Sequence, residues 1–125
     1  MRLWNGWGNE DSDLTMELSD GLRALLEALV GPGTALSQAT LNEVIDKVAN
    51  TRLDDHPLIK TDPETRVRHA RGQSLPDWLE MHSGNVDTFP DGVAFPESSD
   101  QVRDLLVHAK ENNLIVIPYG GGTSV

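Results

Sequence analysis

The residues best suited to chemistry form a glycine-rich run near the end of the chain, Pro118-Tyr119-Gly120-Gly121-Gly122-Thr123-Ser124. Glycines lack a Cβ atom, so they adopt positive φ angles and allow a ligand to approach the main chain closely. Successive backbone N–H groups in such a turn form a concave anion site, to which the two hydroxyl side chains add donors. The pattern is compatible with a phosphate-binding loop, but Gly-Gly turns are common, and by itself it favours a plain glycine turn between two strands.

Two common phosphate motifs do not fit this run. No Gly-Lys-Ser/Thr follows the glycines, which excludes a Walker A loop, and their contiguity excludes the spaced Rossmann fingerprint. The net charge of -10 makes nucleic acid and anionic membrane surfaces unfavourable partners. Fixed backbone dipoles could still hold a diphosphate locally, without a lysine.

A second polar group lies in the middle of the chain, where Arg68, His69 and Arg71 form a small basic patch. It could line a route for a phosphate-bearing substrate. The favoured interpretation is structural, with the arginines as ion-pair partners of Glu64 and Asp77. No catalytic residue is predicted within the chain.

The sequence also predicts that the chain holds no metal. It contains no cysteine, which excludes disulfides, thiolate metal sites and cysteine nucleophiles. His69 and His82 are too far apart in sequence for a helical metal pair. We expect His56 and His108 at the surface.

Four segments carry the elements that would position these groups. Apolar residues recur at i, i+3, i+4 and i+7, the spacing of one helix face, in residues 22–29, 41–48, 75–82 and 102–109. Start and stop signals flank them, namely Ser19, Thr40 with Glu43, Ser74 with Asp77, Ser98 or Ser99, Gly31, Gly84 and Asn112-Asn113.

Strands are predicted on both sides of the last helix. Residues 93–95 form a short apolar piece, and the β-branched run 114–117 is typical of a buried strand. Strand, helix and strand together predict a parallel, right-handed βαβ unit. We expect loops in residues 1–17, 31–39 and 50–65.

The fold class predicted is α+β. A two-stranded parallel sheet is not stable alone, so the chain is expected to be the front of a larger protein. A boundary near Thr88 would separate a helical, loop-rich N-terminal region, 1–87, from the truncated start of an α/β domain, 88–125. Near the N-terminus, Trp4 and Trp7 flank Asn5-Gly6, which predicts a type I′ hairpin pinned by two aromatic side chains.

The glycine run resembles the pyrophosphate loop of a known flavoprotein family. Residues 117–125, Ile-Pro-Tyr-Gly-Gly-Gly-Thr-Ser-Val, are similar to that loop in the vanillyl-alcohol-oxidase/p-cresol-methylhydroxylase (PCMH-type) family. The preceding Pro90-Asp91-Gly92-Val93-Ala94-Phe95-Pro96 resembles its Pro-Asp-x-Val-x-x-Pro strand, and residues 98–113 resemble its first helix. The resemblance implies FAD bound between two α+β subdomains, with Pro118 to Ser124 as cofactor-binding residues.

Two further segments resemble one branch, the alkyldihydroxyacetonephosphate synthases. They are Trp4-Asn5-Gly6-Trp7-Gly8 with Asp11-Ser12, and Arg68-His69-Ala70-x-Gly72-x-Ser74. The branch implies exchange of an acyl group on acyl-dihydroxyacetone phosphate for a fatty alcohol, in ether lipid biosynthesis. Covalent family members often carry a histidine where Thr123 stands, so non-covalent FAD is expected.

The resemblance thus implies an FAD-dependent transferase or oxidoreductase in the full-length protein, with this chain inactive by itself. Its partners would be FAD and a small-molecule or lipid substrate, with a homodimer as a candidate assembly and no nucleic acid. A soluble cytoplasmic protein without a transmembrane segment is expected. The alternatives are an FAD-dependent 2-hydroxy-acid dehydrogenase of the D-lactate or glycolate type, and a non-catalytic helical interaction module.

Overall fold

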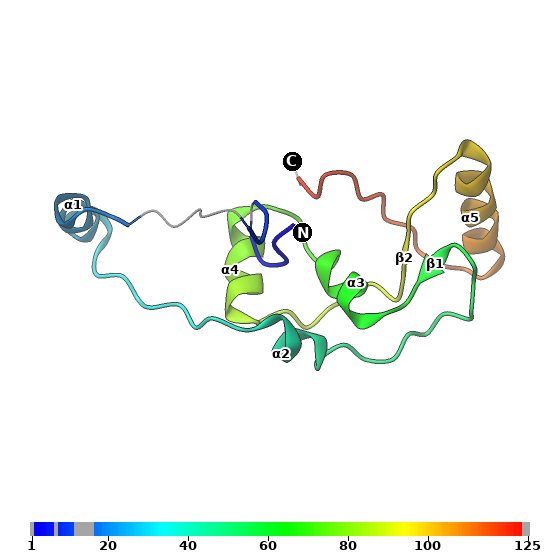
Figure 1. Ribbon diagram of the computed structural model, residues 1–125, viewed down its shortest axis with the longest axis horizontal. Helices are drawn as coiled ribbons and strands as arrows, with labels where there is room; N and C mark the ends of the chain where they lie inside the picture. Colours follow the sequence, from blue (N-terminus) through cyan, green and yellow to red (C-terminus); the bar gives the residue numbers. More distant parts are fainter. Residues whose placement is uncertain (1, 7, 12–16, 124–125) are drawn as a thin grey trace.

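The computed structural model describes residues 2–6, 8–11 and 17–123 and shows an elongated α+β arrangement (Figure 1). The elements are α1 (Asp20–Val30), α2 (Leu41–Ile45), β1 (Ile59–Lys60), α3 (Pro63–Arg68), α4 (Leu75–Ser83), β2 (Val93–Ala94) and α5 (Ser99–Glu111). Helix α1 lies at one end, α2, α3 and α4 form the middle, and the strands with α5 form the other end.

Local capping explains where the helices begin. Ser19 and Ser98 each accept a backbone N–H of the first turn of α1 and α5, and capping boxes begin α2 and α4. Gly84 ends α4 in the left-handed conformation, with φ 70°. These four helices and their caps confirm the sequence prediction.

Two helical details differ from the prediction. Helix α2 has only 5 residues and ends at Ile45, although the predicted apolar spacing continues to Val48. The chain after Ile45 forms a tight turn instead. Helix α3 begins within the stretch 50–65, which the sequence predicts to be a loop. Its signals are local ones: Asp62 accepts the N–H of Thr65, and Pro63 occupies the first turn. The six residues are too few to display an apolar stripe.

The predicted βαβ unit is not formed. Strand β2 pairs antiparallel with β1, in the register Ile59 with Ala94 and Lys60 with Val93. Residues 114–117 form no strand, and Ile115 is 91% exposed. A strand requires a hydrogen-bonded neighbour, and the structure places none beside this run in the described part of the chain. The β1–β2 pair instead joins the regions 1–87 and 88–125.

The core lies in the middle of the molecule. Its buried residues are Val44 of α2, Val67 of α3, Met81 of α4 and Val86. Trp4 of the N-terminal segment and Phe89 pack against this cluster with other partly buried apolar side chains. Helix α4 therefore buries a face centred on Met81, whereas Leu75 and Leu79 of the predicted stripe are 66% and 48% exposed.

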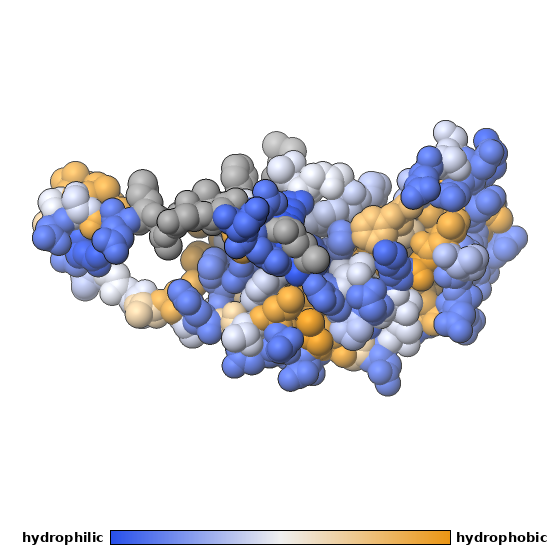
Figure 2. All heavy atoms as spheres, in the orientation of Figure 1, coloured by the Kyte–Doolittle hydropathy of each residue, from blue (hydrophilic) through white to orange (hydrophobic). Residues whose placement is uncertain are grey.

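Apolar faces also remain exposed at both ends of the molecule. Helix α1 has no buried residue, and its leucine stripe faces solvent (Figure 2). Apolar side chains also gather between β2 and α5. Among the described residues, none of the helices has the length and apolarity needed to cross a bilayer.

The segment that precedes β2 is tied to the loop after α2 by Asp91. The Arg52 guanidinium donates to both carboxylate oxygens, with the shortest distance 2.6 Å from Nη2 to Oδ2. The Thr51 hydroxyl donates to the Asp91 carbonyl at 2.8 Å. Hydrogen bonds from Arg52 hold the pKa of the Asp91 carboxyl below its ordinary value.

Asp91→Asn is therefore expected to remove a pH-dependent contribution to stability. Because the folded pKa is lowered, this contribution is present above about pH 4 and is lost as the pH falls through the folded pKa. Arg52 is 84% exposed, so solvent screening limits the expected loss at pH 7 to about 0.5 kcal/mol. Urea denaturation at pH 7 and pH 2.5 checks this, and an equal difference at both pH values would contradict it.

Candidate functional site

The glycine loop returns from α5 to the N-terminal segment. Residues 118–123 are described, whereas Ser124 and Val125 lie outside the described residues. After α5 the chain runs back across the molecule, and the glycine loop contacts Arg2 of the N-terminal segment (Figure 1). Residues more than 110 positions apart in sequence therefore meet at this loop.

The three glycines have different surroundings. A Cβ atom built on Gly120 would meet no atom within 4 Å, and one on Gly121 would meet only Thr123 at 3.9 Å. Gly122 has φ 74°, and a Cβ there would collide with the Tyr119 hydroxyl. One face of the loop is thus open at Gly120 and Gly121, while Gly122 is held against a side chain.

Three contacts hold the loop to the body of the protein. The Arg2 guanidinium donates to the Gly121 carbonyl at 2.9 Å. The Tyr119 hydroxyl donates to the Arg71 carbonyl at 3.2 Å. The Tyr119 ring also meets His69 edge-on, with ring centroids 5.0 Å apart. These bonds are directed to carbonyls and rings, so they do not occupy the backbone N–H groups of the glycines.

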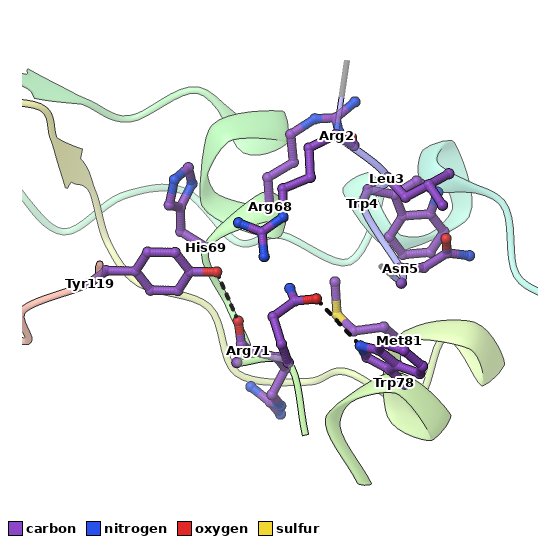
Figure 3. A pocket seen from close by; sticks show the side chains of 13 residues that line it. Arg2, Leu3, Trp4, Asn5, Arg68, His69, Arg71, Trp78, Met81 and Tyr119 are labelled. Atoms are coloured by element: carbon purple, nitrogen blue, oxygen red, sulfur yellow. Dashed lines mark hydrogen bonds between the residues drawn. The ribbon is translucent and has the colours of Figure 1, made fainter. Parts of the chain in front are cut away.

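A cavity of about 210 Å³ lies behind Tyr119 (Figure 3). Its walls come from the N-terminal segment, the turn after α3, and α4. Figure 3 shows Arg68 and Trp78 directed towards it, with the Trp78 Nε1 donating to the Gln73 side chain at 3.3 Å. The cavity therefore combines guanidinium groups with indole rings.

The arginines of the basic patch are paired with carboxylates. Arg68 lies 2.8 Å from Glu64 and 3.2 Å from Glu10. The structural interpretation of Arg68 is therefore confirmed. Because its charge is largely compensated by carboxylates, we interpret the basic patch as stabilising the turn after α3.

The predicted pairing with Asp77 is wrong. Arg71 lies 2.7 Å from Glu80 and 3.7 Å from Asp87. The Asp77 carboxylate instead accepts the N–H and the hydroxyl of Ser74. Asp77 thus serves the capping box of α4, while Arg71 pairs with Glu80 and Asp87.

The N-terminal segment is a hairpin, but not of the predicted type. The Leu3 N–H donates to the Gly8 carbonyl at 3.0 Å, and Arg2 bridges to Asn9. A type I′ turn needs positive φ at both central residues, and neither Asn5 nor Gly6 has it. Gly8 supplies the positive φ instead, at 99°. Trp4 packs on the core as expected, and Trp7 lies outside the described residues.

Arg66 is a buried cation that the sequence did not single out. Its exposure is 4%, its Nε donates to the Pro90 carbonyl at 2.6 Å, and its Nη1 donates to the Ala49 carbonyl at 2.8 Å. It thereby joins α3 to the loop after α2 and to the segment before β2. Nothing in its sequence neighbourhood separates it from Arg68, so the burial depends on the tertiary fold.

The two histidines expected at the surface lie against each other. The rings of His56 and His108 have centroids 4.3 Å apart, and both side chains are half-buried. The pair connects α5 to the loop before β1, which corrects the expectation of isolated surface residues. Among the described residues, no group of three potential ligands could hold a metal ion.

Comparison with known proteins places the chain in a family. No protein-family model matches it. Protein Rv2250A of Mycobacterium tuberculosis is 30% identical to it, over 74% of this chain and 68% of that protein. The chain belongs to the same family as Protein Rv2250A.

Further relatives carry the name of a synthase. Alkyldihydroxyacetonephosphate synthase of Caenorhabditis elegans is 26% identical over 98% of this chain. The chain spans 25% of the length of that protein. A solved structure of an alkyldihydroxyacetonephosphate synthase matches with a TM-score of 0.67 and 23% identity, over 99% of this chain and 28% of the other. The fold is therefore shared, and the relatives carry the name of the branch that the sequence resembles.

Proposed function

We propose that this chain is the N-terminal part of an FAD-dependent enzyme of the alkyldihydroxyacetonephosphate synthase type, in which it contributes the FAD pyrophosphate loop. The observation that supports this proposal most is the open face of the glycine loop at Gly120 and Gly121. The cofactor-binding residues would be Pro118 to Ser124, contacting the diphosphate mainly through backbone N–H groups. The relatives of the chain give the proposal its reaction class.

The residues present fit a diphosphate. The main chain at Gly120 and Gly121 carries no side chain, so a ligand can approach it closely. The positive φ of 74° at Gly122 is typical of turns in which successive N–H groups point to one side. A positively charged guanidinium, that of Arg2, is bound to the same loop. Bound FAD would supply an electron-accepting ring to the reaction, while this chain would supply the grip on its diphosphate.

The region 88–125 would then begin the FAD-binding domain, after a helical region 1–87. We propose that residues 114–117 become a strand parallel to β2 once further strands of that domain lie beside them. Support comes from the exposure of this β-branched run, with Ile115 at 91% and Ile117 at 80%. Adjacent apolar side chains this exposed mark a surface that is normally covered.

The full-length protein tests the proposal. We expect a yellow protein with the visible absorbance of a bound flavin, which exchanges a fatty alcohol into acyl-dihydroxyacetone phosphate. Thr123 cannot form the covalent link to flavin that a histidine forms. Denaturation should therefore release the FAD, and mass spectrometry should detect the unmodified polypeptide. A colourless protein would reject FAD binding. Activity on D-lactate or glycolate without alkyl exchange would reject the synthase type, and a retained flavin adduct would reject non-covalent binding.

A further inference from the structure

We infer that the N-terminal hairpin and the turn after α3 set the conformation of the glycine loop, so that Arg2 and Tyr119 are positioning residues for a diphosphate. This inference rests on the proposed function and extends it to Arg2, which lies outside the loop, and to the side chain of Tyr119. We refer to the Arg2 guanidinium, the His69 ring, the Arg71 carbonyl and the Tyr119 side chain together as the loop clamp.

Arg2 orients a peptide plane of the loop. Its Nη2 donates to the Gly121 carbonyl at 2.9 Å. Because a trans peptide is planar, the Gly121 carbonyl and the Gly122 N–H point in opposite directions. Binding the carbonyl on the side of Arg2 therefore turns this N–H to the other side, away from the hairpin.

Tyr119 fixes the next dihedral angles. Its hydroxyl lies where a Cβ of Gly122 would stand, and it is bound to the Arg71 carbonyl at 3.2 Å. His69 supports the ring edge-on, with the centroids 5.0 Å apart, and His69 Nδ1 lies 2.7 Å from the Thr65 carbonyl. Gly122 is thereby held at φ 74°, a conformation that places neighbouring N–H groups on a common side.

Arg2 also differs in charge balance from the other arginines beside the cavity. Arg68 and Arg71 each lie next to two carboxylates. Among the described residues Arg2 forms no salt bridge, and its guanidinium is bound to a neutral carbonyl. Its positive charge is thus left uncompensated beside the loop, where it would attract a diphosphate to a chain with a net charge of -10.

Two variants separate positioning from folding. Arg2→Met removes the donor and the charge, whereas Arg2→Lys keeps a donor and the charge. Arg103→Met is the matched control, because Arg103 is 71% exposed and its one ion pair within the described residues is with Asp100 on α5. Titration of the flavin-free full-length protein with FAD, followed by quenching of flavin fluorescence, measures the dissociation constant of each variant.

We expect Arg2→Met to weaken FAD binding about tenfold, the effect of one lost charge-assisted hydrogen bond. Arg2→Lys should recover most of the affinity, and Arg103→Met should bind as the wild type does. Riboflavin lacks the diphosphate, so its weaker binding should not distinguish the variants. An Arg2→Met protein that binds FAD within twofold of the wild type would overturn the inference.

Nuclear magnetic resonance tests the loop clamp without any flavin. In the flavin-free chain labelled with 15N-glycine, the order parameters of Gly121 and Gly122 should fall in Arg2→Met and in Tyr119→Phe, but not in Arg103→Met. Rigid backbone gives values of about 0.85, and flexible backbone gives values below about 0.6. Unchanged values would overturn the clamp. If the wild-type full-length protein binds no FAD, the proposed function fails, and the resonance measurement alone decides whether the clamp exists.

Discussion

Replacing Arg66 with methionine is expected to lower the free energy of unfolding by about 3 kcal/mol, the loss typical of a buried hydrogen-bonded cation. The substitution leaves the carbonyls of Ala49 and Pro90 without the donors that now lie at 2.8 Å and 2.6 Å. Methionine keeps an unbranched apolar stem like that of arginine, so the main loss comes from the polar groups left unpaired.

Urea denaturation followed by tryptophan fluorescence measures this change. The free energy of unfolding of Arg66→Lys should fall between those of the wild type and Arg66→Met. A single ammonium on a shorter stem cannot reach both carbonyls in the same geometry. Arg103→Met, on the exposed face of α5, should change the free energy by less than about 0.5 kcal/mol. If the free energy of unfolding of Arg66→Met lies within about 0.5 kcal/mol of the wild-type value, the hydrogen bonds from Arg66 to the two carbonyls do not stabilise the fold as inferred.

The second large effect is expected on cofactor binding: Gly121→Val should abolish FAD retention in the full-length protein. A Cβ at Gly121 would meet only Thr123, at 3.9 Å, so the loop can accommodate the side chain without FAD. The branched side chain would then stand where the diphosphate must approach the main chain. We expect a loss of at least about a hundredfold in affinity, since both the close approach and the hydrogen bonds from the N–H groups are lost.

Gly33→Val provides the matched control for this experiment. Gly33 lies in the loop between α1 and α2, and a Cβ there would meet no atom within 4 Å, so the position is at least as open as Gly121. The same substitution in equally open space should leave the flavin absorbance unchanged. Gly122→Val would be a poorer test, because φ 74° and the neighbouring Tyr119 would disturb the fold itself. Full yellow colour in Gly121→Val would count decisively against the loop as the diphosphate site.

The helices illustrate what could be read from local sequence. A cap needs only a side-chain acceptor two or three residues before an N–H group, so Ser19, Thr40 and Ser74 specify where α1, α2 and α4 begin. The glycine loop was likewise apparent, because positive φ and close approach are properties of glycine itself. Its position at residues 118–124 and its family resemblance required no coordinates.

The sheet illustrates where local sequence misleads. The run 114–117 has the composition of a buried strand, yet Ile115 is 91% exposed, because pairing requires a neighbour that composition does not supply. Strand β2 pairs instead with β1, which is only 2 residues long and lies in a stretch where apolar residues show no regular spacing. A pairing of this length depends on tertiary contact rather than on a pattern.

The sequence by itself determined the starts of α1, α2, α4 and α5, the glycine loop and the branch of relatives, since each depends on residue types within a few positions of one another. Only the tertiary structure decided that α4 buries the face of Met81, that Arg66 is the buried arginine, and that Arg2 reaches Gly121. Arg2 and Gly121 are separated by 119 positions. No spacing rule links residues so far apart, because their meeting depends on how the whole chain folds back on itself.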